Sequence, residues 1–299
     1  MGMRIGVLFV GELHDGGFNA IALDGVNRAG ADLTVLSGVP YDQGAIRDRI
    51  EAEMAALDGL ICIGGQGNRV MPDVAAAHPD KHFAVVQGAV TGANLASYDV
   101  RQEQSAYLAG CLAGLVTRTG TVGHLSGHRV TPGLKGRAAF VAGVRDSAPE
   151  VRVLTGFCGT QDDNAVVRDW ADAQIAGGAD VIFTMLNGAR QGAIDACRAG
   201  GIRQIGNARD WTLVDPAVFL ASAVARIDLG VERAIADMRA GEVPEQIRHF
   251  GLAEGDYAAL SLAEDVPQNT RIRLDGVAAR IRAGALSVPE TYEGPEFAP

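Results

Sequence analysis

Residues 4–29 read RIGVLFVGELHDGGFNAIALDGVNRA, and this stretch indicates the fold class. The apolar run at residues 4–10 has no polar alternation, which is typical of a strand buried on both faces of a parallel sheet. A glycine-rich loop at residues 11–17 follows, and residues 18–29 have the spacing of a helix. A strand that leads through such a loop into a helix predicts one βα unit of an α/β protein.

The same alternation continues along the chain. Further strand-like runs lie at residues 32–37, 59–64, 82–87, 120–125, 152–157, 180–185, 204–206, 218–222 and 246–251. Helical segments lie at residues 43–56, 68–77, 101–117, 132–147, 163–176, 189–199, 226–239 and 268–283. Because such alternation favours right-handed βαβ crossovers, we predict two similar α/β halves with a boundary near residue 119.

The last part of the chain returns to complete both halves. We therefore predict an N-terminal lobe of residues 1–119 plus 212–250 and a C-terminal lobe of residues 120–211 plus 251–299. Ligands of open parallel sheets bind beyond the carboxyl ends of the strands. Two such sheets that face each other predict one ligand cleft between the lobes.

Composition narrows the class of protein. The chain has 299 residues, 47% of them apolar, and 26 basic residues against 36 acidic ones give a net charge of −10. This balance argues against nucleic acid as a partner, because phosphate binding needs a concentrated positive surface. No apolar run reaches the ~18 residues of a membrane span. We expect the four cysteines, which form no C-x-x-C pair, to be buried free thiols.

Signatures of enzymes and metal sites are weak. The spacing of Gly11, Gly16 and Gly17 does not make G-x-G-x-x-G, and the run 64–67 (GGQG) lacks the G-K-[ST] ending of a phosphate-binding loop. His124 and His128 follow a strand and need not share a face, so no metal site is predicted. Asp162 and Asp163 are better placed to begin a helix than to act as an acid/base pair. We expect no catalytic residue, no cofactor and no enzyme.

The loop after the first strand holds the densest group of candidate residues. Asp15 and Asn19 offer polar contacts, and Phe18 offers a ring face to a planar ligand. A second, compatible interpretation is that Asp15 caps the following helix while the glycines make the turn.

Several short motifs then follow one another in a recognisable order. They are Asp15-Gly16-Gly17-Phe18-Asn19, Pro79-Asp80-Lys81-His82-Phe83, Asn94-Leu95-Ala96-Ser97-Tyr98, Glu103 with Ala106-Tyr107-Leu108-Ala109-Gly110, Gly120-Thr121-Val122-Gly123, Gly178-Ala179-Asp180-Val181-Ile182-Phe183, Ile205-Gly206, and Ser222 with Asp228. In this order and spacing the chain resembles the basic-membrane-protein family of substrate-binding lipoproteins, of the purine nucleoside receptor type. The resemblance covers residues 4–284.

The resemblance implies a type I periplasmic-binding-protein fold, with two Rossmann-like lobes, parallel sheets and a hinge that the chain crosses several times. It also implies that a purine-type ligand is captured in the cleft for an ABC importer. Phe18 matches an aromatic residue that stacks on the base in the family, and Asp15 and Asn19 match its polar contacts. Asn187, with Gly188, matches a loop that lines the family's cleft.

The chain departs from the family at four cleft positions. The second stacking aromatic falls at Gln161, and the aspartate after the fourth strand falls at Gln87. The first acid of the Gly-x-Asp-x-Asp pattern falls at Ala208, which leaves Asp210, and the family's lysine falls at Ala225. Without these partners for the ribose, we expect a nucleobase-like planar heterocycle to be favoured over a nucleoside.

Neutral amides and one indole ring could replace the missing groups. Gln66, Gln87 and Gln161 would each donate and accept hydrogen bonds at a base edge, and Trp211 could supply the second ring. The alternatives are a solvated surface position for each glutamine and a hinge or core anchor for Trp211.

Three classes of function remain open at this stage. The first is a monomeric solute receptor that binds a small, purine-like molecule by hinge closure and delivers it to an ABC permease. The second is a cytoplasmic ligand-sensing regulator on the same fold, and a receptor for another ring-containing ligand such as a flavin is a variant of these. The third is an α/β enzyme. Residues 1–10 lack a secretory signal, so the protein is either cytoplasmic or extracytoplasmic with its leader removed.

Overall fold

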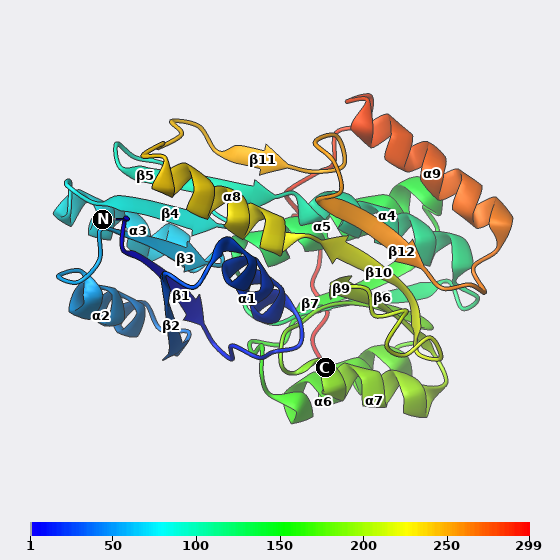
Figure 1. The fold of residues 1–299 in the computed structure, drawn as a ribbon. Coiled ribbons are helices and arrows are strands. Elements are labelled where there is room, and N and C mark those ends of the chain that lie inside the picture. Colours follow the sequence, from blue (N-terminus) through cyan, green and yellow to red (C-terminus); the bar gives the residue numbers. More distant parts are fainter. Residues whose placement is uncertain (1) are drawn as a thin grey trace. The chain divides into compact units, whose positions relative to one another are not determined.

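The apolar run near the start of the chain forms β1 (Ile5–Val10), in which every residue is buried. The computed structural model describes residues 2–299 and divides them into two units. Of the described residues, unit 1 comprises 2–100 and 226–250, and unit 2 comprises 101–225 and 251–299. Each unit is built around one sheet with helices on both faces (Figure 1). The predicted fold class of two mostly parallel α/β lobes is confirmed.

Unit 1 has a sheet with the strand order β11-β5-β4-β3-β1-β2, in which all neighbouring strands are parallel. Its remaining elements are α1 (Phe18–Ala29), β2 (Leu33–Val39), α2 (Gln43–Glu53), β3 (Gly59–Ile63), α3 (Gly67–Ala77), β4 (His82–Val86), β5 (Leu95–Val100), α8 (Ile227–Arg239) and β11 (Arg248–Phe250). Helices α1 and α8 pack side by side, and α2 packs beside α3 (Figure 1).

Unit 2 has the strand order β12-β10-β9-β8-β6-β7, with β12 antiparallel to β10 and the other pairs parallel. Its elements are α4 (Gln102–Val116), β6 (Thr121–Ser126), α5 (Thr131–Ser147), β7 (Arg152–Phe157), α6 (Asn164–Ala176), β8 (Val181–Met185), α7 (Arg190–Gly200), β9 (Arg203–Ala208), β10 (Phe219–Ala225), β12 (Ala258–Leu262) and α9 (Gln268–Arg282). The two sheets therefore repeat one strand order, with β1 to β5 of unit 1 equivalent to β6 to β10 of unit 2, and they differ in the direction of the edge strands β11 and β12.

The chain passes between the units at residues 100/101, 225/226 and 250/251. The last division agrees with the expected one, but the first two differ from the expected divisions near residues 119 and 212. The first division differs because α4 packs on α5 and β10, both of which belong to unit 2. The second differs because β10 pairs with β9 and so belongs to unit 2. An apolar helix such as α4 can cover either sheet, and its sequence does not say which.

The first two crossings share a short arrangement of side chains. Arg101 precedes α4 and its Nε donates to Glu103 at 3.0 Å, while Arg226 precedes α8 and its Nε donates to Asp228 at 2.9 Å. Both carboxylates are buried in the first turn of their helix, where the helix dipole favours negative charge. The repeated topology thus extends to the side chains at the points where the chain changes unit.

Helices α4 and α5 approach closely because glycines face each other. A Cβ atom on Gly110 would lie 2.1 Å from the carbonyl oxygen of Phe140, and one on Gly143 would lie 2.1 Å from that of Tyr107. No side chain fits at either position, so these glycines bring the two backbones into contact. This pair of helices contributes to one of the two hydrophobic core clusters of unit 2 among the described residues.

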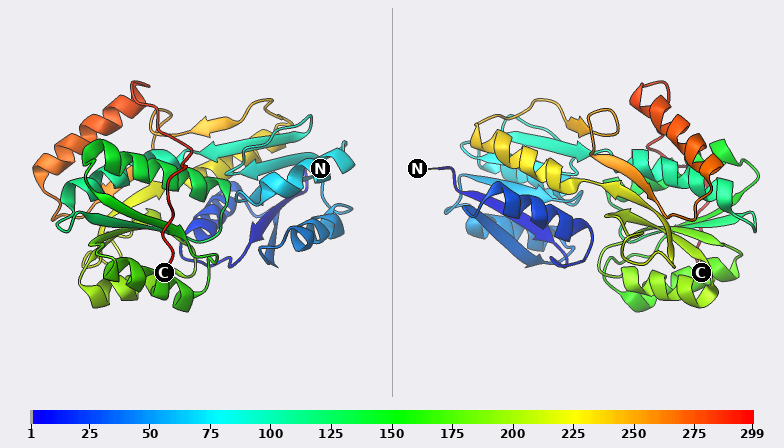
Figure 2. Two further views of the ribbon diagram at one scale, coloured as in Figure 1. Left: turned by 180° about the vertical axis from the view of Figure 1, so that it is seen from behind. Right: turned by 45° about the vertical axis from the view of Figure 1, so that its right-hand side comes forward.

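The C-terminal tail runs along unit 2 after α9 (Figure 2). The Phe297 amide donates to the carbonyl of Thr155 on β7 at 2.7 Å, and β7 is the edge strand of its sheet. Glu296 pairs with Arg129 and Arg137, and these hydrogen bonds lower the pKa of its carboxyl to about 2. The tail therefore covers a strand edge that is otherwise open to pairing with another chain.

The cysteines follow the expectation with one exception. Cys62, Cys111 and Cys197 are buried free thiols, whereas Cys158 is only half-buried. Burial raises the pKa of the Cys62 thiol to about 12, so it remains protonated and acts as a small apolar side chain. Cys158 lies in the loop after β7 and donates to the carbonyl of Thr160.

Candidate functional site

The candidate residues of unit 1 lie at the carboxyl ends of β1, β3 and β4, which are neighbours in the sheet. Asp15, in the loop after β1, is buried and acts as a cap for α1. Its carboxylate accepts from the amides of Gly17 at 2.8 Å, Asn19 at 3.0 Å and Ala20 at 3.1 Å. These bonds satisfy amides at the start of α1 that no helix carbonyl can reach. They favour the capping interpretation of Asp15.

Asn19 holds the same loop from the other side. Its side-chain nitrogen donates to the carbonyls of Val10 and Glu12, both at 2.9 Å, and the residue is 2% exposed. Both amide hydrogens are therefore used within the loop. Asn19 and Asp15 fix the position at which α1 begins, and α1 begins with Phe18.

Phe18 and Gln66 border the same glycine. A Cβ atom on Gly64 would lie 2.5 Å from Gln66 Oε1 and 3.7 Å from Phe18 Cε1. Gly64 has φ +105° and follows β3, so the loop turns there without a side chain. Both neighbouring side chains are half-buried. Within residues 2–299 the Gln66 amide makes no hydrogen bond and no other aromatic ring contacts Phe18, so a ring face and an amide lie side by side.

Gln87 has a different environment from the one expected. It follows β4 with φ +63° and is 1% exposed. Its Nε2 donates to the Val100 carbonyl at 3.1 Å, and its Oε1 accepts from the Val100 amide at 2.7 Å. Both ends of the amide thus extend the pairing of β4 with β5. One Nε2 hydrogen and one Oε1 lone pair remain, but at 1% exposure the side chain does not present them to a ligand in this structure.

In unit 2, Gln161 connects three loops. Its Oε1 accepts from the Asn187 amide at 3.2 Å, and its carbonyl accepts from the Ala189 amide at 2.8 Å. A Cβ atom on Gly127, in the loop after β6, would lie 2.5 Å from Gln161 Cδ. The structure thus brings Gln161 and Asn187 together at the ends of β6, β7 and β8. The Gln161 Nε2 has no hydrogen-bond partner within residues 2–299.

Asp210 and Trp211 lie in the turn between β9 and β10. The Asp210 carboxylate accepts from the amide and the hydroxyl of Thr212 at 3.0 and 2.6 Å. The Trp211 indole stacks on Phe219 with ring centroids 5.6 Å apart, and its Nε1 donates to the Asn207 carbonyl at 3.0 Å. These contacts favour the core-anchor interpretation of Trp211 over a stacking role.

Sequence reasoning missed Arg190. This residue begins α7, is 3% exposed, and lies 4.4 Å from the Trp211 ring centroid. Its Nη1 donates to Asn207 Oδ1 at 2.7 Å. A cation in the first turn of a helix opposes the helix dipole, and this could have served as a sequence signal. Arg190 holds Asn207 and Trp211 in place at the end of β9.

Ala208 and Ala225 are both buried, at 2% and 1% exposure. These are the positions at which the resemblance places the family's first acid and its lysine. Asp163 caps α6 through the amides of Ala165 and Val166, which confirms its expected place at a helix start.

No helix within residues 2–299 is both long and apolar enough to cross a bilayer.

Comparisons with known proteins agree with this architecture. The model of a family described as Bmp, ABC transporter substrate-binding protein PnrA-like, matches residues 3–258. A CD4+ T-cell-stimulating antigen of Listeria monocytogenes is 25% identical over 94% of this chain and 86% of its own length. An ABC transporter nucleoside-binding protein, BmpA of Lactococcus lactis, is 24% identical over 62% of this chain and 56% of its own length.

A solved structure shows the same fold. The solute-binding protein of an ABC transporter system from Aeropyrum pernix superposes with a TM-score of 0.84 at 20% identity, covering 96% of this chain and 94% of that one. The family model covers most of the chain, from the first strand to β12. The chain therefore belongs to the Bmp family of PnrA-like ABC-transporter substrate-binding proteins.

Proposed function

We propose that this substrate-binding protein captures a purine-type planar heterocycle, with a free nucleobase favoured over a nucleoside, and delivers it unchanged to an ABC permease outside the cytoplasm. The observation that carries the proposal is the placement of Phe18 and Gln66 around Gly64. An aromatic face contributes stacking to any flat ring. An amide that both donates and accepts can pair with the edge of a base.

The contacts in unit 2 support the same class of ligand. Gln161 keeps an Nε2 donor without a partner, next to the Asn187 loop. The methyl groups of Ala208 and Ala225 occupy the positions at which the resemblance places an acid and a lysine for the ribose. A bound ribose would therefore have hydroxyl groups without these partners. Burying polar groups that make no hydrogen bond lowers affinity. A base without its sugar avoids that cost.

The relative from Lactococcus lactis is described as nucleoside-binding, which supports a purine-type or pyrimidine-type ligand for this chain as well. The preference for the base alone rests on this chain's own residues. We propose that the ligand-binding form is a monomer.

A thermal-shift panel tests the proposal. The purified protein is heated with adenine, guanine, hypoxanthine, uracil, the matching nucleosides, riboflavin and simple sugars. A ligand at a hundred times its Kd adds about 2.7 kcal/mol to the folded state, enough to raise Tm by some degrees. We expect a shift with purine bases and a smaller one with their nucleosides. A larger shift with nucleosides contradicts the base preference, and no shift with bases or nucleosides contradicts the ligand class.

A glutamine variant tests the proposed pairing with the base edge. Gln66→Leu should weaken binding of the active base by about tenfold, the effect of losing roughly one hydrogen bond. Gln43→Leu on α2 is the matched control, because Gln43 is exposed and lies outside the loops that end β1, β3 and β4. Equal affinity in the Gln66 and Gln43 variants contradicts the assignment of Gln66.

A further inference from the structure

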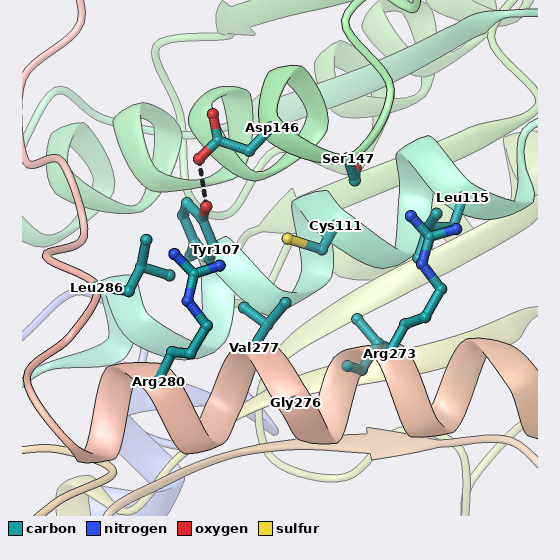
Figure 3. A pocket seen from close by; sticks show the side chains of 11 residues that line it. Tyr107, Cys111, Leu115, Asp146, Ser147, Arg273, Gly276, Val277, Arg280 and Leu286 are labelled. Carbon is teal, nitrogen blue, oxygen red and sulfur yellow. Dashed lines mark hydrogen bonds between the residues drawn. The ribbon is translucent and has the colours of Figure 1, made fainter.

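A groove in unit 2 lies between α4, the end of α5 and α9 (Figure 3). Its volume is about 510 Å³, within the range of small-molecule sites. It is formed by unit 2 alone, and α9, which makes one of its walls, follows the residues that the family model matches. None of the residues that line the groove is among those assigned to the purine-type ligand, so the two sites are separate.

Two arginines of α9 line the groove. Arg273 and Arg280 are seven residues apart, which is two helical turns, so they project from the same face (Figure 3). Both are exposed, and within residues 2–299 neither guanidinium makes a hydrogen bond or an ion pair. Val277 lies between them on α9, and Leu286, which follows the helix, lies beyond Arg280 (Figure 3). Two cations that make no ion pair within the described residues thus line a groove with apolar walls.

The two ends of the groove differ in charge. At one end Tyr107 donates its hydroxyl hydrogen to the carboxylate of Asp146, and Arg280 lies beside them (Figure 3). At the other end Arg273 lies beside Leu115 (Figure 3). The Asp146 carboxylate offsets the field of Arg280 more than that of Arg273. An anion is therefore favoured at the Arg273 end, and an apolar group at the Tyr107 end.

Gly276 keeps the groove open. It lies in the interior of α9 and lines the groove, and a Cβ atom built on it would meet no atom within 4 Å. Glycine in a helix interior is destabilising relative to alanine, and packing does not require it here. At this position α9 presents only its backbone to the groove, whereas a larger residue would place a side chain in it. This observation is independent of the arginines.

We propose that this groove binds a small amphiphilic carboxylate, with its carboxylate on Arg273 and its apolar chain along Val277 toward Leu286. The planar guanidinium matches a carboxylate with two parallel hydrogen bonds. The apolar chain covers Val277, Leu286 and the ring of Tyr107. The net charge of −10 makes this local pair of cations distinct from the chain's average surface.

Isothermal titration calorimetry with decanoate below its micelle concentration tests the proposal. Decanol has the same chain without the charge, and acetate has the charge without the chain. We expect decanoate to bind, and decanol and acetate to bind at least about tenfold more weakly, because each lacks one of the two contacts. Absence of decanoate binding, or equal binding of decanol, overturns the proposal.

Three variants of α9 test the site and the orientation. Arg273→Gln should weaken decanoate binding by about tenfold or more, as expected for loss of a hydrogen bond to a charged group. Arg280→Gln should weaken it less. Arg282→Gln is the matched control, because Arg282 is exposed on α9 and does not line the groove. Unchanged binding in Arg273→Gln, or a larger loss in Arg280→Gln, overturns the assignment.

A fourth variant fills the groove without removing a charge. Gly276→Leu should abolish decanoate binding while Tm stays level or rises, since the added side chain enters open space. Retained binding in this variant contradicts the location. The same titration in Phe18→Ala protein should be unchanged, because Phe18 does not line the groove. The test of the groove is therefore independent of the test of the purine-type site.

Discussion

Gln87 and Ala208 occupy equivalent places in the two sheets and share a rare backbone conformation. Gln87 directly follows β4 with φ +63°, and Ala208 ends β9 with φ +70°. Within residues 2–299 they are the non-glycine residues with positive φ. β4 and β9 are the third strands of sheets that repeat one order. Each unit thus holds a strained residue at the carboxyl end of the same strand, where the surrounding structure must stabilise it.

Ala208→Gly should relieve that strain. A left-handed conformation costs an L-residue roughly 1–2 kcal/mol, and glycine avoids this cost at some expense in chain entropy. We expect the free energy of unfolding to rise by about 0.5–1 kcal/mol, measured by urea denaturation. The converse control is Gly120→Ala, at φ +71° with nothing within 4 Å of the new Cβ, which should lower it by a similar amount. A loss of stability in Ala208→Gly contradicts the prediction.

Two helix glycines of unit 2 should respond to alanine with opposite signs. Gly110→Ala places a Cβ 2.1 Å from the Phe140 carbonyl oxygen, so α4 and α5 must separate. We expect the free energy of unfolding to fall by about 2–3 kcal/mol. Gly276→Ala meets no atom within 4 Å and should raise it by about 0.5–1 kcal/mol. Thermal and urea denaturation of both variants, side by side, check the signs. The same sign in both contradicts the packing argument.

His124 should make the protein less stable in mild acid. It is fully buried in β6, with Nδ1 2.9 Å from Thr155 Oγ1 and Nε2 2.9 Å from Ser126 Oγ. Burial, with a smaller contribution from Arg137, lowers its pKa from 6.5 to about 3. Between these values the unfolded chain binds a proton that the folded chain does not. The neutral ring therefore makes its full contribution to the free energy of unfolding above pH 6.5, the pKa of the histidine in the unfolded chain. That contribution falls as the pH drops below this value.

The measurement is the free energy of unfolding between about pH 5 and 6.5, where one such group contributes a slope of up to about 1.4 kcal/mol per pH unit. His124→Asn should lower stability at neutral pH and reduce that slope. Some slope will remain, because burial also lowers the pKa of His128. The carboxyl of Glu296, with its pKa near 2, titrates below this window. An unchanged slope in His124→Asn contradicts the prediction.

Phe18→Ala should weaken binding of the active base. Stacking of a base on an aromatic ring contributes about 1–3 kcal/mol, so the Kd should rise roughly tenfold or more. Phe18→Trp keeps a ring at the position and should retain most of the affinity. Calorimetry with both variants, and their Tm without ligand, separates binding from folding. Unchanged affinity in Phe18→Ala shows that Phe18 does not contact the ligand.

The sequence was most informative where a pattern has one structural solution. The run at residues 4–10 and the glycine loop after it could form little other than a buried parallel strand and a turn. The pattern said less about α4, because a helix apolar on most of its surface suits either sheet. Its place in unit 2 depends on the facing glycines Gly110 and Gly143, whose role is visible only when both helices are in place.

Residue type also concealed the roles of two candidates. Gln87 gave no sign of a positive φ, because such a conformation normally favours glycine, and its hydrogen bonds to Val100 depend on a strand that follows later. Trp211 offered a ring in the sequence, but in the fold this half-buried ring already contacts Phe219 and Arg190. Local patterns reveal which groups are present; packing decides which remain available.

The interleaved chain also has a consequence for synthesis on the ribosome. Unit 1 lacks α8 and β11 until residue 250 has been made, and unit 2 lacks β12, α9 and the tail until later still. A nascent chain that stops at residue 225 therefore holds two sheets that each lack an edge strand and a covering helix. The last quarter of the polypeptide therefore completes both units in turn, unit 1 at residue 250 and unit 2 only afterwards.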